Sequence, residues 1–363
     1  MSDTQRQEEE LVLTPLTRVV EEHGIDPLAA RLIELRNWLA DDLSPLEAAI
    51  EAFDRDALAA EPELPDVPGT LGRKAARHLL DRPGKRIRSL CVLLAARMGG
   101  LKLDARVRDL AIACEMVHAA TLLHDDVIDE GTERRGAAAA RMIYGNSASI
   151  LGGDHLLIEA LRFVERSGSH LLLKDLLDVI SEMVGAEAMQ LEQRMRFTPN
   201  RDVYLKVIDG KTAALFRWGL SAGGYAANLS PEQVQAMGRA GTALGMAFQL
   251  IDDVIDLEGE DTGKDPLADL REGKLTWPVI IAAERDRNLA AELKERVSDA
   301  EPLKPEEGRD LVARIRSTGA LEATRAFAEF QGERARNELE SLPRSMARTA
   351  MSWVVDAAIH RKR

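Results

Sequence analysis

The sequence predicts an all-α protein, and three observations support this fold class. The chain of 363 residues is 45% hydrophobic but only 4% aromatic, a composition that suits a soluble, helix-dominated protein. Apolar residues recur at helical spacing in most segments, and no run alternates with the period of two that marks a half-buried strand. The connections between segments are mostly short and often carry Gly or Pro.

The first elements follow from local signals. Residues 1–27 are polar and weakly periodic, so we expect an acidic N-terminal extension. From Leu28 onward, apolar residues at i, i+3 and i+4 predict a helix. A second helix is expected to start with Ser44 as its N-cap, Pro45 in the first helical position and Glu47 in the third.

Beyond the Pro-rich loop at 61–69, helix is expected to follow helix. The segment 258–275 is long, charged and Gly-bearing, and loops of that length inside a compact domain tend to be functional. Nothing after Leu28 resembles a linker, so we predict one large all-α domain over 28–363. The expected helices lie near 70–80, 86–98, 105–130, 148–166, 172–196, 201–227, 231–257, 276–287, 305–317, 321–341 and 343–361.

The net charge of −13 is unevenly distributed. Residues 1–66 hold 17 acidic and 5 basic residues, whereas the remainder holds 44 and 43. The acidity therefore belongs to the leading segment, and we expect no nucleic-acid partner.

Cysteine usage and hydropathy indicate the compartment. Cys91 and Cys114 lie in apolar helical stretches and are interpreted as buried small hydrophobes. A reducing environment is the default for such a chain. No stretch reaches the length of a membrane span, and the N-terminus has no secretory apolar region. We expect a cytoplasmic protein.

The most informative feature is an acidic pentapeptide, Asp-Asp-Val-Ile-Asp, that occurs twice, at 125–129 and 252–256. In a helix, the first and last Asp of each copy share a face, with the second Asp beside it. Two such helices facing each other would surround a cavity with up to six carboxylates, which need cations between them. Magnesium bridging to substrate phosphates is the natural filling. The predicted metal ligands are Asp125, Asp126, Asp129, Asp252, Asp253 and Asp256.

A solvated helix face is the alternative interpretation of these acids. The flanking residues argue against it, because each Asp pair is preceded by an apolar run and followed by Val-Ile. Such helices are expected to be buried on most faces, and charged residues are rarely buried unless they are paired or bound to metal.

Basic residues lie near both clusters. The segment 84–88, Gly-Lys-Arg-Ile-Arg, supplies three cations at an expected helix start, where a Gly and a helix N-terminus favour an anion. Arg134 and Arg135 follow the first cluster, and arginine forks can grip phosphate oxygens in two places. Lys211 lies in a largely apolar helix. His118 shares the face of Asp125 two turns earlier, where a core histidine is the alternative.

Two lysines, Lys264 and Lys274, lie in the long loop after the second cluster. For these lysines and for Arg86, a solvated surface charge is the alternative. A P-loop is dismissed, because Gly263-Lys264 lacks the upstream Gly and has Asp265 where Ser or Thr is required.

Seven segments in order resemble the trans-polyprenyl diphosphate synthase family, over about residues 41–290. They are GKRIR, HAATLLHDDVIDEGTERRG, GNSASILGGDHLL, GAEAMQ, GKTAALF, AFQLIDDVID and GKDPLADLREGKLTWP. The resemblance implies a large helical bundle of the isoprenoid synthase type, with about ten core helices around a central cavity, and a homodimer. It also implies magnesium-dependent, head-to-tail condensation of isopentenyl diphosphate onto an allylic diphosphate, with possible peripheral membrane contact for product release.

The resemblance also implies residue roles. The six aspartates correspond to the magnesium-binding motifs, and Gln249 to a glutamine of the cavity. Lys211, Arg134 and Gln249 are the expected catalytic residues. The allylic diphosphate would be held by Arg134, Lys211, Thr212 and Lys274, with Lys264 close to it. Isopentenyl diphosphate would be bound by Lys85, Arg88, His118 and Arg135.

The chain departs from the family pattern at several positions. Pro83 replaces the first Gly of GGKR, and Ser89 replaces a Pro. Gly185-Ala186 replaces the Glu-Gly of an EGE segment, and Trp277 replaces a Leu. None of these changes removes a metal-binding Asp or a diphosphate-binding Arg or Lys.

Product length is expected to follow from a gate just before the first cluster. Short-chain members of the family place bulky aromatics there, whereas this chain has Ala120 and Thr121. An apolar tail would meet no ring near the metal site, so the pocket can extend as an apolar tunnel. We therefore predict a product longer than geranylgeranyl diphosphate.

Three other classes of protein fit these residues less well. A class I terpene cyclase shares one DDxxD motif, but its second metal motif mixes Asn, Ser or Thr with Glu. A catalytically inactive regulatory subunit would be expected to have lost aspartates or diphosphate-binding arginines. A purely structural helical scaffold leaves the acids within apolar helices unexplained.

Overall fold

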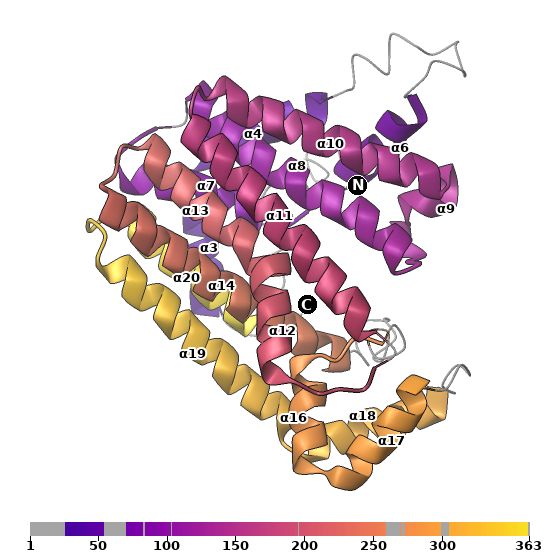
Figure 1. Ribbon diagram of the computed structural model, residues 1–363. Helices are drawn as coiled ribbons and strands as arrows, with labels where there is room; N and C mark the ends of the chain where they lie inside the picture. The colour runs from indigo at the N-terminus through magenta and orange to yellow at the C-terminus, as the bar shows by residue number, and fades with distance from the viewer. Residues whose placement is uncertain are drawn as a thin grey trace. The chain divides into compact units, whose positions relative to one another are not determined.

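The computed structural model describes residues 26–53, 70–82, 84–102, 104–194, 196–258, 269, 273–298 and 305–361. These residues fall into two compact units. One comprises described residues within 1–176, 219–234 and 343–351, and the other those within 177–218, 235–342 and 352–363. Apart from one two-stranded hairpin, the regular structure in the described ranges is helical (Figure 1). The predicted all-α class is confirmed.

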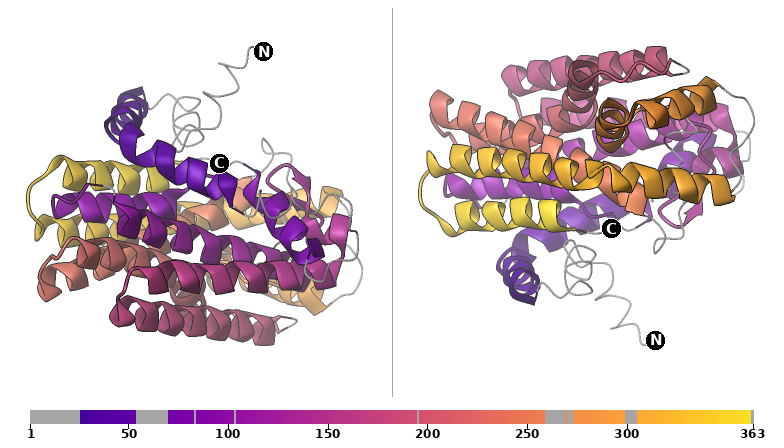
Figure 2. Two further views of the ribbon diagram at one scale, coloured as in Figure 1. Left: turned by 90° about the horizontal axis from the view of Figure 1, so that it is seen from above. Right: turned by 90° about the horizontal axis from the view of Figure 1, so that it is seen from below.

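The first unit begins with α3 (Asp26–Trp38) and α4 (Ala40–Ala52), followed by α6 (Thr70–Leu80), α7 (Ile87–Met98) and α8 (Ala105–Ile128). Strands β1 (Glu133–Arg134) and β2 (Ala137–Ala138) form the hairpin, and α9 (Ala140–Tyr144) and α10 (Asn146–Arg166) follow. Helices α8 and α10 lie side by side (Figure 2). Gly152 of α10 allows α6 to approach closely, because a Cβ at Gly152 would lie 2.7 Å from the carbonyl oxygen of Gly72.

The second unit holds α12 (Arg201–Ile208), a π-helical turn η1 (Asp209–Ala213), α16 (Trp277–Arg285), α17 (Arg287–Ser298), α18 (Pro305–Ser317) and α19 (Ala320–Glu340). Helices α11 (His170–Gln193), α13 (Ala214–Ala226), α14 (Pro231–Glu258) and α20 (Met346–His360) contribute residues to both units. The second unit contains a run of aromatic rings. The Trp277 centroid lies 5.4 Å from that of Tyr204, in a tilted arrangement, and 4.9 Å from that of Phe327, in a stacked one.

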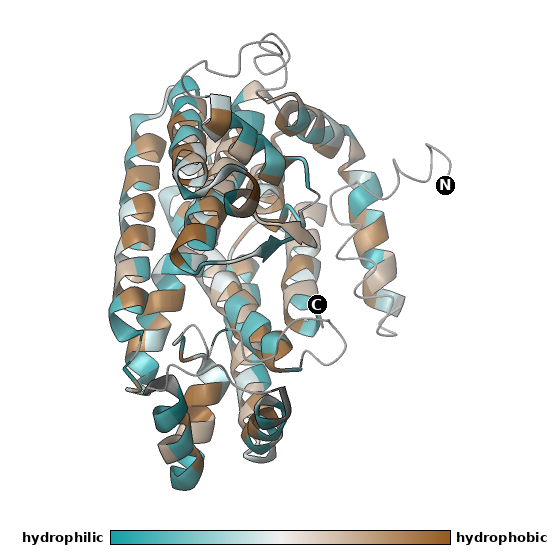
Figure 3. Cartoon of the chain, turned by 90° about the vertical axis from the view of Figure 1, so that its right-hand side faces the viewer, coloured by the Kyte–Doolittle hydropathy of each residue, from teal (hydrophilic) through white to brown (hydrophobic). Residues whose placement is uncertain are grey.

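Amphipathic patterning explains most of these helices, which carry apolar and polar residues along their length (Figure 3). Helix α7 differs, because all its residues except Arg88 and Arg97 are buried. Cys91 and Cys114 are free and buried, as expected. Burial raises the pKa of the Cys91 thiol to about 12, which keeps it protonated.

The second predicted helix start is wrong. Helix α4 begins at Ala40 rather than after Ser44, and it carries Pro45 in its interior. Leu39, Leu43 and Leu46 form one buried stripe at helical spacing, so burial outweighs the backbone hydrogen bond that the proline removes.

Other expectations about secondary structure also need correction. The hairpin of β1 and β2 was not predicted, because strands of two residues show no alternation. The helix expected over 201–227 is interrupted by η1, and the helices α9 and α17 were missed. The first helix begins at Asp26, and the rest of the predicted extension lies outside the described residues. The single domain over 28–363 stays a prediction.

Candidate functional site

The first aspartate cluster lies at the end of α8. Asp125 and Asp126 belong to its last turn, and Asp129 is the C-cap, with φ −90° and ψ 0°. Asp126 is buried, whereas Asp125 and Asp129 are half-buried. The three carboxylates therefore differ in their access to solvent.

Asp126 is held by Arg134. Its Oδ1 accepts hydrogen bonds from Arg134 Nε at 2.8 Å and Nη2 at 2.5 Å. Its Oδ2 is buried and has no hydrogen-bond partner within the described ranges. Burial raises the pKa of Asp126, while Arg134 acts in the opposite direction. A buried carboxylate oxygen without a donor fits a cation, so the residues present fit a divalent metal.

A tight turn presents the two arginines after this cluster. Arg134 pairs with Ala137 in the hairpin, and the two turn residues, Arg135 and Gly136, have φ values of 52° and 72°. Positive φ at both central residues is the signature of a type I′ turn. The guanidinium of Arg135 donates to the carbonyl of Arg82 at 3.1 Å and packs against Gly84, where a Cβ would lie 3.0 Å from its Nη2.

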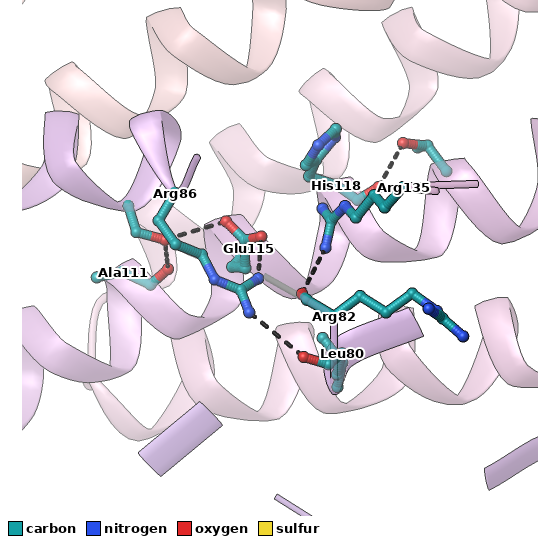
Figure 4. A network of polar contacts seen from close by, with 9 residues as sticks. Leu80, Arg82, Arg86, Ala111, Glu115, His118 and Arg135 are labelled. Carbon is teal, nitrogen blue, oxygen red and sulfur yellow. Dashed lines mark hydrogen bonds and ion pairs between the residues drawn. The ribbon is translucent and has the colours of Figure 1, made fainter. Parts of the chain in front are cut away.

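The GKRIR segment begins α7 next to this turn. Lys85 and Arg88 are half-buried. Arg86, the N-cap of α7, adopts a left-handed conformation with φ 48° and forms an ion pair with Glu115 of α8. Figure 4 shows Arg86, Glu115, His118 and Arg135 gathered in one network. Burial and the neighbouring arginines, Arg88 first, lower the pKa of His118 well below its usual value, so its imidazole is neutral at pH 7.

The second cluster lies at the end of α14. Asp252 and Asp256 are half-buried, whereas Asp253 is buried. Asp253 accepts hydrogen bonds from the Tyr204 hydroxyl, from Gln249 Nε2 at 3.0 Å and from the backbone N–H of Trp277 at 3.1 Å. Burial raises its pKa to about 7, against the lowering effect of the first two bonds. In both clusters the middle Asp is thus the buried one, fixed by donors from the protein.

The π-helical turn brings Lys211 and Thr212 into the same unit as the second cluster. Thr212 Oγ1 donates to Gln249 Oε1 at 2.8 Å, which links this turn to Asp253 through Gln249. Lys211 forms an ion pair with Glu187 of α11. Such π turns interrupt α-helices frequently at functional sites. The close approach of Gly210 to Ala186 shapes this turn, since a Cβ at Gly210 would lie 2.7 Å from the Cβ of Ala186.

The remaining predicted residues are placed as follows. Lys274 is half-buried, and its backbone N–H donates to the carbonyl of Asp269 at 2.8 Å. Lys264 lies outside the described residues. Ala120 is fully buried on α8, and the hydroxyl of Thr121 donates to the carbonyl of His118 at 2.8 Å.

Sequence reasoning missed four residues beside the clusters. Glu115 and Glu187 pair with Arg86 and Lys211, Tyr204 donates to Asp253, and Arg361 lies 2.7 Å from Asp252. Glu115 precedes His118 by three residues in an apolar helix, and this spacing was an available signal. The others come from distant segments.

No three His, Cys, Asp or Glu side chains converge as a ready-made metal cage in the part of the chain that the structure describes. Magnesium ordinarily takes only one or two carboxylates and completes its shell with waters and substrate phosphates. The described helices include none long and apolar enough to cross a membrane.

The fold and the site define an all-α protein whose aspartate clusters, each beside basic side chains, suit a cation and an anionic substrate. The polyprenyl synthetase family model matches residues 70–315, and the chain belongs to this family. The predicted resemblance is confirmed.

Individual relatives and a solved structure are similar to this chain over most of its length. Octaprenyl diphosphate synthase of Escherichia coli (strain K12) is 34% identical, and the alignment covers 79% of this chain and 88% of the relative. Nonaprenyl diphosphate synthase of Mycobacterium tuberculosis is also 34% identical, covering 78% and 85%. A solved polyprenyl synthase from Caulobacter crescentus CB15, complexed with calcium and isoprenyl diphosphate, is 32% identical with a TM-score of 0.80, covering 92% of this chain and 98% of that one.

Proposed function

We propose that this chain is a polyprenyl diphosphate synthase that condenses isopentenyl diphosphate with an allylic diphosphate, head to tail. The observation that carries the proposal is the complete set of motif residues, with no aspartate, arginine or lysine of the diphosphate motifs replaced. A product longer than geranylgeranyl diphosphate is supported by the small residues Ala120 and Thr121 and by relatives named for octaprenyl and nonaprenyl products.

Magnesium is the proposed cofactor. Magnesium ions would be bound by Asp125 and Asp129 at the first cluster, where Asp126 would contribute its unpartnered Oδ2. At the second cluster, Asp252 and Asp256 would be the direct ligands. Asp253, whose carboxylate accepts three hydrogen bonds, would orient the end of α14. When bound, magnesium supplies positive charge that stabilises the departing diphosphate.

The basic residues divide between two substrates. Arg134, Lys211, Thr212 and Lys274 would hold the allylic diphosphate, with Lys264 close to it, and would stabilise the charge that develops on it as the C–O bond breaks. Gln249 would keep Thr212 and the second cluster in register through the hydrogen bonds it makes to both. Lys85, Arg88, His118 and Arg135 would bind isopentenyl diphosphate, with His118 as a neutral hydrogen-bonding group.

The chemistry then needs no protein nucleophile. Loss of diphosphate leaves an allylic carbocation, and the double bond of isopentenyl diphosphate attacks it to form the new carbon–carbon bond. A proton leaves the resulting cation and is taken by the departing diphosphate. The protein binds, orients and excludes water.

A cytoplasmic homodimer is also proposed. Leu177, Val184 and Leu191 of α11 are 49%, 65% and 50% exposed, and their seven-residue spacing puts them in one apolar stripe that a second copy would cover. Sedimentation of a Val184→Asp variant tests this proposal, because the dimer should dissociate.

The apolar product would leave the protein through peripheral contact with a membrane.

The decisive experiment is to incubate the purified protein with farnesyl and isopentenyl diphosphates and magnesium, then to size the dephosphorylated products. Asp125→Ala and Asp252→Ala should each lower turnover by orders of magnitude with intact helical circular dichroism. Asp310→Ala, at an exposed position of α18, should leave turnover unchanged. Turnover by the chain alone also rules out an inactive regulatory subunit. Near-normal rates in either cluster variant would refute the assignment of the site.

A further inference from the structure

Glu115 is a buried carboxylate for which neither the family resemblance nor the proposed mechanism has a role. It lies on α8, one turn before His118, and is only 2% exposed. An ionised carboxylate is costly to bury unless cations and donors surround it. The groups around Glu115 meet this condition, and they belong to the proposed isopentenyl diphosphate site.

Arg86 is the principal partner of Glu115. Its Nη1 forms the ion pair, and its Nη2 donates to the carbonyl of Leu80 at 3.5 Å. Arg86 lies between Lys85 and Arg88 in sequence, but its guanidinium is engaged with α8 and with the end of α6. Its left-handed backbone is unfavourable for an arginine and persists only where surrounding contacts enforce it. The ion pair is such a contact.

Ser89 ties the same segment to α8 a second time. Its hydroxyl is fully buried and lies 2.9 Å from the carbonyl of Ala111 and 3.4 Å from Glu115 Oε2. The resembled family has a proline here, which could donate neither bond. This second tie is therefore specific to chains with a hydroxyl at this position.

The charge of Glu115 is set by the groups packed around it. Burial alone would raise the pKa of Glu115, but nearby positive charges, Arg86 foremost, lower it to about 2. The carboxylate of Glu115 is therefore ionised at pH 7, and its negative charge offsets the repulsion between the guanidinium groups of Arg86 and Arg135. Arg135, which Figure 4 draws with Glu115 in one group of polar contacts, also lowers this pKa.

We propose that Glu115 is the positioning residue of the isopentenyl diphosphate site: it fixes Arg86 and Ser89, and so holds Lys85 and Arg88 ready for the diphosphate. This proposal rests on the proposed function of the chain. Glu115 does not touch the substrate. Its effect is preorganisation, which lowers the cost of ordering the basic residues when the anion binds.

The test compares Glu115→Gln with wild type in steady-state kinetics and in calorimetric binding of isopentenyl diphosphate. Losing a buried hydrogen bond to a charged group typically weakens an interaction about tenfold or more. We expect the KM and the Kd for isopentenyl diphosphate to rise by about that factor, with the KM for the allylic substrate changed less than about twofold. Equal rises in both KM values, or no rise in either, would overturn the proposal.

A matched control is available at the other end of α7. Asp42 is a buried carboxylate that pairs with Arg97 in the last turn of that helix, with Arg97 Nε 2.6 Å from Asp42 Oδ2. Asp42→Asn therefore removes an equivalent buried charge from the same helix, away from Lys85 and Arg88. Its KM values should stay at wild-type levels. If Asp42→Asn raised the KM for isopentenyl diphosphate as much as Glu115→Gln, any loosening of α7 would be enough to raise this KM. That result would contradict a specific positioning role for Glu115.

Two further variants keep the proposal testable if Glu115→Gln does not fold. Ser89→Ala should raise the same KM by a smaller factor, and Arg86→Gln should reproduce the effect of Glu115→Gln. The double variant Arg86→Gln/Glu115→Gln should raise the KM for isopentenyl diphosphate no more than either single variant does, because Arg86 and Glu115 act as one unit. Additive effects would contradict the proposal. If wild type itself failed to bind isopentenyl diphosphate, the proposed function would fail, whereas wild-type binding with an unaffected Glu115→Gln would refute only the positioning role.

Discussion

Arg361, at the end of the described chain, lies with its Nη2 2.7 Å from Asp252 Oδ1, the first carboxylate of the second cluster. The arginine is 2% exposed. Its guanidinium also donates to the carbonyls of Phe248 and Ala358 and stacks 3.6 Å from the centroid of the Phe248 ring. These contacts fix the guanidinium independently of Asp252. It therefore holds Oδ1 of Asp252, one of the proposed metal ligands, in a fixed position.

This contact predicts that Arg361→Gln will weaken metal binding. Partners that orient a metal-binding carboxylate typically change metal affinity by about 10–100-fold when removed. We expect the Kd for Mn²⁺, measured by electron paramagnetic resonance without substrate, to rise within that range. Arg361→Lys should not restore it, because a lysine cannot reproduce the fork and the stacking. Arg336→Gln, which breaks an ion pair between α19 and α20, controls for loosening of α20. Unchanged or tighter Mn²⁺ binding in Arg361→Gln would contradict this role.

Glu115 predicts a specific loss of stability in acid. Its pKa is about 2 in the folded protein and near 4.5 in the unfolded chain, so its contribution is present above the unfolded value and is lost as pH falls from about 4.5 towards 2. The full contribution is at most about 3 kcal/mol. The free energies of unfolding of wild type and Glu115→Gln, measured in urea, should therefore differ most at pH 7 and least near pH 2.5. If this difference grew as the pH fell, the predicted direction of the effect would be wrong.

Most of the helices and both aspartate clusters could be predicted from the sequence, because long amphipathic segments and repeated motifs are local signals. The short helix α9 and the helix α17 could not. The helix start predicted at Ser44 was wrong, because N-cap preference is a local signal that ignores burial. The buried stripe through Leu39 and Leu43 determines where α4 begins. The type I′ turn at Arg135 could not be foreseen, because arginine has no preference for positive φ.

Partners that come from distant segments were beyond sequence reasoning. The hydrogen bond between Tyr204 and Asp253 joins residues 49 positions apart, and Arg361, which follows α20, lies beside Asp252 of α14. Nothing in the local pattern distinguishes Asp253 from its neighbours. Its burial, unlike the half-buried state of Asp252, follows from the packing of α12 and α16 around it.

Gly84 predicts an effect transmitted through Arg135. A Cβ at Gly84 would lie 3.0–3.1 Å from the guanidinium of Arg135, so Gly84→Ala must push that side chain away by a few tenths of an ångström. We expect the KM for isopentenyl diphosphate to rise a few-fold, with the melting temperature nearly unchanged. Gly185→Ala is the control, because a Cβ there meets open space and the substitution favours the helix. Similar KM values in the two variants would show that Arg135 tolerates the displacement.

The length of the product is the last prediction. Ala120 is fully buried on α8, five residues before Asp125, and Cys114 and Val117 on the same helix are also small and buried. If the growing tail runs along this helix, a ring at position 120 blocks it soon after the diphosphate site. Ala120→Phe should therefore shift the main product to farnesyl or geranylgeranyl diphosphate, as judged by chromatography of the dephosphorylated alcohols. A long product from a folded Ala120→Phe enzyme would place the gate elsewhere.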